Sequence, residues 1–186
     1  PTTSQLIPDA KTNDLGVFSN LDYVVNDWSF LFGTRFDYRT INAESNSFKN
    51  DFNALSTSIG FSKKINDHKL KFSYSSAFRT PHISELLSDG VHHATKRYEV
   101  GDPDLIEEKG NQLDLTYEWS DEHLGFIVNP FYNNIDDFII LSPQDSFINN
   151  NPLYVYEQLG NVQLKGIEMN IHYHPHFIHQ LHIEER

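Results

Sequence analysis

Histidines and carboxylates gather in residues 80–110, and these side chains are the ones in this sequence best suited to hold a metal. The predicted ligand-binding set is His82, Asp89, His92, His93 and Glu99. Imidazole and carboxylate together suit zinc, copper or nickel, and an exposed imidazole can also ligate haem iron. On an extended backbone His92 and His93 point to opposite faces, so both reach one ion only if the chain bends. We predict these two histidines as metal ligands; the alternative is that they are surface histidines that face water.

A second group of histidines lies near the end of the sequence. His172 and His174 are two positions apart, so on a strand they share one face. Three further histidines follow at His176, His179 and His182. We predict His172 and His174 as additional metal ligands. The alternative is that they belong to a polar lining with no ligand.

Other kinds of chemistry find no support in the sequence. There is no Gly-x-Ser-x-Gly element, no His-Glu-x-x-His and no glycine-rich phosphate loop, so we expect no enzyme and no resident cofactor. With no cysteine, disulfides and thiolate metal sites are excluded. The net charge of −12 argues against a surface that neutralises phosphates, so nucleic acid is not an expected partner.

The elements that must position these residues are strands, because hydropathy alternates with a period of two. From Trp28 to Arg39, aromatic residues fall on one face and polar residues on the other. The same alternation recurs in residues 15–25, 52–64, 70–79, 112–119, 124–133 and 166–174. No run of about 18 apolar residues exists, which excludes a membrane-spanning helix. The sequence therefore predicts an all-β, antiparallel fold.

The connections between these strands alternate between compact and long. Compact polar turns are expected at 25–27, 65–68 and 120–123, and long polar loops at 41–51, 80–110 and 142–153. Short turns on one side and long loops on the other are typical of outer-membrane barrels. Strands of roughly 10 or more residues also fit a tilted membrane strand better than a soluble one. The alternative is a soluble β-sandwich used for adhesion or carbohydrate binding.

In such a barrel, the polar residues that alternate with the aromatic ones face the lumen. On this basis we predict Arg35, Asp37, Arg39, Lys71 and Arg79 as lumen-lining residues. The aromatic residues near the compact turns would form a girdle at the membrane interface.

The stretch from Tyr74 to Leu115 carries the most distinctive pattern in the sequence. It contains Phe-Arg-Thr-Pro at 78–81, Ser-Glu-Leu at 84–86, Gly-Asp-Pro-Asp-Leu at 101–105 and Glu-Lys at 108–109. A second pattern at 159–168 includes Leu-Gly-Asn-Val and Lys-Gly-Ile-Glu. Together and in this order they resemble the barrel of TonB-dependent receptors.

We expect most of this pattern to be scaffold, because turn chemistry explains the residue types. Pro81 cannot donate to a sheet and so ends a strand. Gly101 would allow a left-handed turn, and Pro103 would fix the backbone shortly after it.

The resemblance implies a bacterial outer-membrane transporter with a 22-stranded barrel closed by a plug domain. It implies ligand binding on the extracellular side and energy from the inner-membrane proton gradient through a TonB–ExbB–ExbD complex. Residues 1–186 would then be a partial barrel domain of about eight strands. The plug, the TonB-contacting N-terminal region and the C-terminal strands would be absent. Expected partners are the plug, outer-membrane lipid, and a transported ligand that is zinc, haem or a ferric siderophore.

Overall fold

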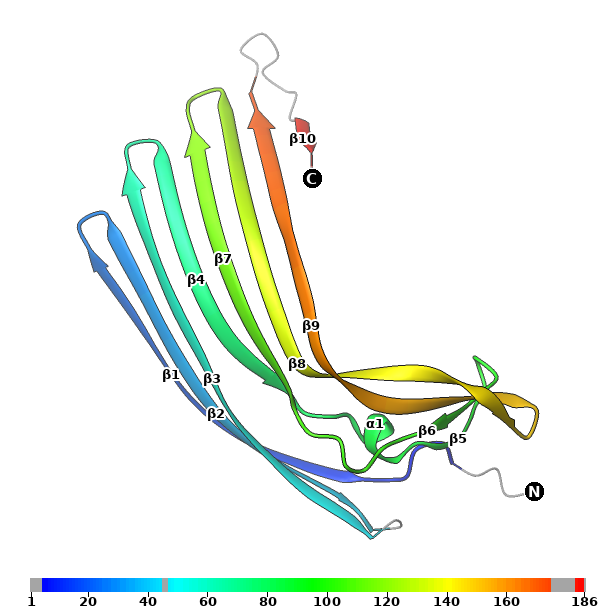
Figure 1. Ribbon diagram of the computed structural model, residues 1–186. Coiled ribbons are helices and arrows are strands. Elements are labelled where there is room, and N and C mark those ends of the chain that lie inside the picture. Colours follow the sequence, from blue (N-terminus) through cyan, green and yellow to red (C-terminus); the bar gives the residue numbers. More distant parts are fainter. Residues whose placement is uncertain (1–4, 45–46, 175–182, 186) are drawn as a thin grey trace.

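The computed structural model describes residues 5–44, 47–174 and 183–185, which form one large curved sheet (Figure 1). Its long strands are β1 (Lys11–Val25), β2 (Trp28–Ala43), β3 (Phe48–Ile65), β4 (His68–Arg79), β7 (Glu108–Ser120), β8 (Leu124–Ile148) and β9 (Asn151–Tyr173). The shorter elements are α1 (Ile83–Leu87), β5 (Asp89–His92), β6 (Arg97–Val100) and β10 (Ile183–Glu185). The predicted all-β fold is confirmed. No helix in the described ranges is long and apolar enough to cross a membrane.

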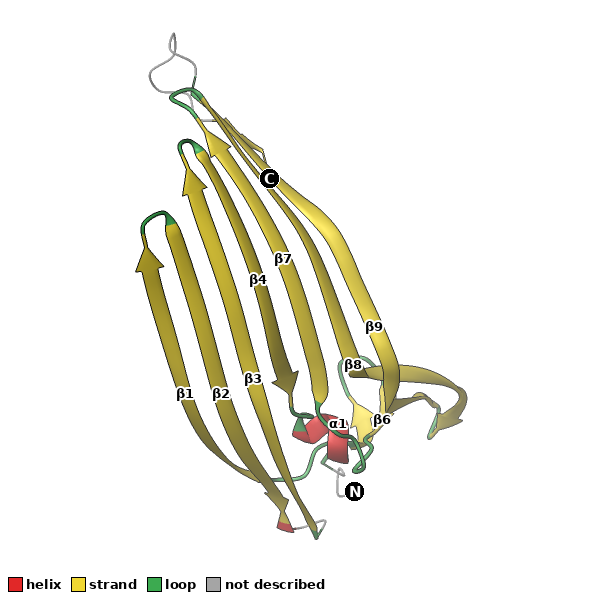
Figure 2. Ribbon diagram, turned by 60° about the vertical axis from the view of Figure 1, so that its left-hand side comes forward, coloured by secondary structure: helices red, strands yellow, loops and turns green. Residues whose placement is uncertain are grey.

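The strands follow the order β1-β2-β3-β4-β7-β8-β9-β6-β5, and β10 also pairs with β9. All neighbours are antiparallel except β6 and β9, which run parallel through Tyr98–Leu153, Glu99–Tyr154 and Val100–Val155. The sheet is open, with β1 at one edge (Figure 2). Among the described residues, the free edge of β9 pairs only near its two ends, with β6 and with β10.

One end of the sheet carries the compact turns that the sequence predicts (Figure 1). Val25 pairs with Trp28 and Ile65 with His68, so only two residues lie in each turn. In each turn the first residue is an asparagine with a left-handed φ, 51° at Asn26 and 52° at Asn66. Asparagine adopts this conformation at lower cost than most residues, which explains where these hairpins reverse.

At the opposite end, two of the predicted long loops are wrong. Strands β2 and β3 continue through most of 41–51, and β8 and β9 continue through most of 142–153. The β8–β9 ribbon reverses at Asn149 and Asn150, whose φ values of 50° and 62° suit the tightest hairpin turns. Polar composition was misleading here because a ribbon that extends beyond the rest of the sheet needs no apolar face. The third stretch, 80–110, is a true connection that contains α1, β5 and β6.

The register separates an apolar face from a polar face across all the long strands. One transverse row reads Tyr23, Phe30, Phe61, Phe72 and Leu115, and the ring centroids of Phe61 and Phe72 lie 5.1 Å apart. The neighbouring row on the other face reads Val24, Ser29, Ser62, Lys71 and Thr116. Large side chains on the apolar face are exposed, for example Leu21, Ile59, Ile167 and Met169.

Buried core residues cluster where the 80–110 connection meets the sheet. The cluster consists of Ile41, Phe52, Leu86, Leu105 and Ile139, contributed by β2, β3, α1, the segment before β7, and β8. In the described residues no second sheet covers the apolar face, so the aromatic residues do not form the closed interior of a sandwich. The soluble sandwich is therefore not favoured.

Candidate functional site

Arg79, the last residue of β4, connects its own strand to three other elements at the end of the sheet that faces the 80–110 connection. Its guanidinium donates to both carboxylate oxygens of Glu108 at 2.7 Å, and to Glu85 in α1 at 2.8 and 3.0 Å. Glu108 also accepts the backbone N–H of Ile139 in β8 at 2.8 Å. Arg79, predicted as a lumen-lining charge, thus links β4, α1, β7 and β8 on the polar face.

His82 is the N-cap of helix α1, and its side chain accepts the N–H of Ser84. The backbone N–H of His82 donates to Glu85 Oε2 at 2.6 Å, completing a capping box. His82 was predicted as a ligand-binding residue. In the structure it is exposed and caps this short helix.

The left-handed turn expected at Gly101 is wrong, because no glycine in the described ranges has a positive φ. Gly101 is needed for close approach instead. A Cβ built on it would lie 2.6 Å from the carbonyl carbon of Leu86 and 2.6 Å from the nitrogen of Leu87. Its N–H donates to the carbonyl of Ser88 at 2.7 Å. The glycine thus lets the returning chain lie directly against α1.

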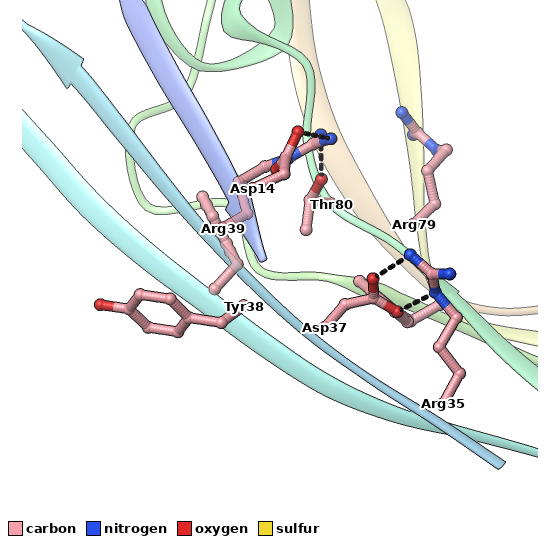
Figure 3. Close-up of a pocket in the computed structure, with 9 residues that line it drawn as sticks. Asp14, Arg35, Asp37, Tyr38, Arg39, Arg79 and Thr80 are labelled. Carbon is pink, nitrogen blue, oxygen red and sulfur yellow. Dashed lines mark hydrogen bonds and ion pairs between the residues drawn. The ribbon is translucent and has the colours of Figure 1, made fainter. Parts of the chain in front are cut away.

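A hollow of about 340 Å³ lies on the polar face beside this junction (Figure 3). Arg39 contacts Asp14 across the β1–β2 pair at 2.6 Å and Thr80 at 2.7 Å. Arg35 and Asp37, on the same strand, form a two-bond ion pair at 2.6 and 2.7 Å. Arg79 also lines the hollow, together with Tyr38, Phe52 and Phe78. Four of the five predicted lumen-lining residues therefore meet at one place.

Lys71, the fifth predicted lumen-lining residue, lies on the same polar face but outside this hollow. It pairs in register with Ser62 and Thr116, nearer the compact turns. The polar face is thus charged along much of its length, with arginine concentrated beside the long connection.

The acidic residues of the predicted ligand set are held by partners within the β5–β6 hairpin. Asp89 accepts the Tyr98 hydroxyl at 2.8 Å, and buried Glu99 accepts Arg97 Nε at 2.6 Å. The hydrogen bond to Asp89, together with burial, raises the pKa of Tyr98 above its usual value. Arg97 also lies over the ring of Tyr154, 5.1 Å from its centroid. This hairpin is fixed to β9 by side chains as well as by backbone pairing.

His92 and His93 lie at the turn of this hairpin. His92 is half-buried and His93 is exposed, and the buried Nδ1 of His92 has no hydrogen-bond partner among the described residues. The carbonyl of His92 accepts the N–H groups of Thr95 and Lys96, which closes the turn. Across the described ranges no three His, Asp or Glu side chains are placed to hold a metal ion. Ligation by His92 and His93 stays a prediction.

His172 and His174 lie at the opposite end of the sheet, beside the compact β7–β8 turn. His172 pairs with Gly125, and the His174 N–H donates to the carbonyl of His123 at 2.7 Å. Their imidazole Nε2 atoms contact each other. Along β9 they are separated from the β6 pairing by about 18 residues, on the order of 60 Å for extended chain. The two predicted histidine groups therefore cannot share one ligand. His176, His179 and His182 lie outside the described residues.

Sequence reasoning missed two residues that hydrogen-bond to Arg39 in the hollow, Asp14 and Thr80. Asp14 stands in register opposite Arg39, but the two are far apart in sequence, so only the strand pairing reveals the contact. Thr80 lies directly after Arg79 and was read only as part of the scaffold. Its hydroxyl is the acceptor that draws Arg39 toward the connection.

The comparisons with known proteins agree with this geometry. The sequence profile of the family described as TonB dependent receptor-like, beta-barrel matches residues 1–181. No curated protein matches the sequence.

Solved structures with the same fold include several uptake proteins. The haemophore receptor HasR of Serratia marcescens, in complex with its haemophore HasA and haem, aligns with a TM-score of 0.75 at 15% identity, over 91% of this chain and 33% of HasR. The copper transporter OprC aligns with a TM-score of 0.75 at 17% identity, over 89% of this chain and 27% of OprC.

The iron transporter FrpB of Neisseria meningitidis aligns with a TM-score of 0.68 at 15% identity, over 92% of this chain and 25% of FrpB. The chain thus spans between a quarter and a third of the length of each of these three structures. At these identities the similarity shows the fold alone. With the profile match over nearly the whole sequence, it follows that this chain belongs to the TonB-dependent receptor-like β-barrel family.

Proposed function

We propose that the whole protein imports a metal or metal chelate across the bacterial outer membrane, with energy supplied through TonB. The observation that carries this proposal is the division of one sheet into an exposed apolar face and a charged polar face. A lipid bilayer satisfies the first face and an aqueous lumen the second.

We further propose that residues 1–186 are one section of a larger closed barrel. An unpaired strand edge in lipid costs several kcal/mol per exposed backbone group, so β1 and β9 require neighbouring strands. The alignments with HasR, OprC and FrpB, each over only part of the larger protein, support this arrangement.

The compact turns then lie on the periplasmic side and the 80–110 connection on the extracellular side, following the usual arrangement of such barrels. In this orientation Arg35, Asp37, Arg39 and Arg79 line the outer part of the lumen, beneath the connection, and Lys71 lies deeper. His82, Asp89, His92, His93 and Glu99 belong to the segment that a ligand meets first.

The ligand class is proposed from the structural neighbours, whose names refer to haem, copper, iron and siderophores. Haem and ferric siderophores are chelates, whereas copper would need direct protein ligands. Zinc was also expected from the histidines, and it is tested beside the others.

Uptake by the intact receptor tests this function. Cells that carry the whole protein as their only receptor of this kind should accumulate haem, a ferric siderophore, copper or zinc. This accumulation should stop when the proton gradient is dissipated or TonB is deleted. If accumulation of every ligand is unaffected by loss of TonB, the energised-transport proposal is wrong. If the full-length protein dissolves as a monomer without detergent, the membrane barrel is wrong as well.

A further inference from the structure

A lysine lies on the apolar face of the sheet, close to the compact turn between β3 and β4 (Figure 1). The register places it in a transverse row with Val25, Trp28, Leu70 and Tyr117. This residue, Lys63, is half-buried. A charged side chain on a face that meets lipid is unfavourable unless it reaches polar partners. The position of Lys63 therefore asks which group neutralises it.

The ammonium group of Lys63 is held by an aromatic ring. Its Nζ lies over the ring of Trp28, 4.8 Å from the centroid, and Trp28 stacks on Phe30 with centroids 6.0 Å apart. This cation–π contact orients the ammonium but does not neutralise it. Among the described residues Lys63 forms no ion pair, and its transverse row contains no aspartate or glutamate. Its counter-ion must therefore come from outside this part of the chain.

His68 is the diagonal neighbour of Lys63 on the same face. Lys63 pairs with Leu70, and Ile65 pairs with His68, so the Cα atoms of Lys63 and His68 are about 7–8 Å apart. The exposed His68 contacts the Tyr117 hydroxyl through Nδ1 at 2.7 Å. When that hydroxyl is the donor, the neutral ring carries its proton on Nε2, as the protonated ring also does. An ammonium and an N–H donor are then close enough to share one phosphate group.

The charge around this hairpin is opposite to that of the whole sequence. The net charge is −12, yet four lysines fall within residues 63–71. Lys64 and Lys69 pair with each other on the polar face, where Lys69 lies 3.8 Å from a carboxylate oxygen. The carboxylates near this end include those in the turns and on the polar face: Asp27, Asp67 and Glu118. The apolar face is thus locally positive, which favours an anionic partner.

We propose that Lys63 and His68 bind the phosphate of an anionic phospholipid, with Trp28 and Tyr117 fixing the two cationic or donating groups. In the orientation proposed above, this end of the sheet lies at the periplasmic headgroup layer, where tryptophan and tyrosine are also expected. The acyl chains then lie along the exposed apolar face. The site rests on the membrane barrel of the proposed function, but not on its ligand or on TonB.

Photocrosslinking on the intact detergent-solubilised receptor tests the site. The probe is phosphatidylglycerol with a photoreactive group beside its headgroup, and the readout is the lipid concentration that half-saturates crosslinking to residues 61–72. K63Q should raise this concentration about fivefold, as expected for the loss of one cation near a headgroup. K63Q/H68F should raise it about tenfold or more, because a second donor is lost. K63R should stay within twofold of the parent, since arginine also stacks on aromatic rings and binds phosphate.

K64Q is the matched control. It removes the same charge from the neighbouring residue of the same hairpin, but on the polar face, so it should change half-saturation less than twofold. The same photoreactive group on phosphatidylcholine should crosslink more weakly, and K63Q should affect it less, because choline offsets the phosphate charge. Soluble glycerol phosphate should compete far less well than the lipid, because it has no acyl chains.

Four results would overturn the proposal, each with unchanged migration on a heat-modifiability gel to show correct folding. They are K63Q within twofold of the parent, equal effects of K63Q and K64Q, equal effects of K63Q on the two lipids, and equal competition by glycerol phosphate. Any of them, in a receptor that still needs detergent, removes the lipid site and leaves the barrel in place. A full-length protein that dissolves without detergent would instead remove the barrel itself.

Discussion

Replacing Arg79 by methionine tests the idea that one guanidinium holds the 80–110 connection against the sheet. The substitution keeps a long side chain of similar reach and removes the hydrogen bonds that Arg79 donates to Glu85 and Glu108. Glu108 then remains nearly buried, with its side chain 10% exposed, and keeps only the Ile139 N–H as a donor.

The size of the effect follows from these exposures. A hydrogen bond to a charged group contributes about 1.5–3 kcal/mol, and leaving a nearly buried carboxylate unpaired costs a similar amount. The Arg79 side chain is 44% exposed, so solvent screens part of this interaction. We expect the free energy needed to open the connection to fall by about 2 kcal/mol, which corresponds to roughly a 30-fold larger population of the open state.

Hydrogen exchange measured by mass spectrometry on the intact receptor reads this opening directly. The informative amides are those of Gly101 and Asp102, which donate to Ser88 and Glu85. Their exchange should accelerate by about 30-fold in R79M, while amides in the middle of β3 keep the parent rate.

Arg35 supplies the matched control. It forms an equally short ion pair with Asp37, but its side chain is 51% exposed, and within the described part of the chain its side-chain hydrogen bonds go to Asp37 and not to the connection. R35M should change exchange at Gly101 by less than about threefold, as expected for an exposed pair. Equal exchange in R79M and the parent, or equal acceleration in R35M, would show that Arg79 does not hold the connection.

The remaining predictions concern packing, membrane exposure and ionisation. Gly101→Ala should lower the free energy of opening the same connection by about 1–3 kcal/mol, because the added Cβ clashes with the backbone of α1. Gly160→Ala should leave hydrogen exchange unchanged, because nothing lies within 4 Å of its added Cβ. Similar exchange in the two variants would contradict the close approach at Gly101. Leu115→Arg, on the apolar face, should destabilise the barrel by about 2–4 kcal/mol, measured by urea unfolding in lipid vesicles. Thr116→Arg, on the polar face, should destabilise it far less. The reversed order would mean that the two faces are misassigned. The raised pKa of Tyr98 means that its contribution to hairpin stability is complete below pH of about 10 and is lost as the pH rises through the pKa of the folded state. Near-ultraviolet titration of the parent, compared with Tyr98→Phe, should show this phenol ionising at a higher pH than a free tyrosine. Ionisation at the ordinary tyrosine pKa would refute the prediction.

The strands could be predicted because alternation is a local property. The stretch 28–39 placed its aromatic and polar residues on separate faces, and the register keeps them there across β1 to β4. The compact turns were also visible, since asparagine and aspartate mark them. The strand ends in 41–51 and 142–153 were predicted less accurately, because the alternation of apolar and polar residues is weak where both faces of a strand meet water.

The contacts of the hollow could not be predicted from the sequence alone. The sequence suggested that Arg35, Arg39 and Arg79 share a face, but their partners depend on which strands are neighbours and in what register. Asp14 reaches Arg39 through strand pairing, and Glu85 reaches Arg79 through the packing of α1. Gly101 was misread for a related reason, since a close approach between distant segments leaves no local signal.

The parallel pairing of β6 with β9 sets an order on how this protein can fold. The β5–β6 hairpin lies in the connection between β4 and β7. Through β6 it pairs with Leu153, Tyr154 and Val155 of β9, which come much later in the sequence. Closing such a long loop is slow, because its entropy must be lost before the contacts form. The surface formed by the 80–110 connection should therefore form last, after β8 and β9 have paired, and a chain interrupted before β9 would lack the strand that completes it.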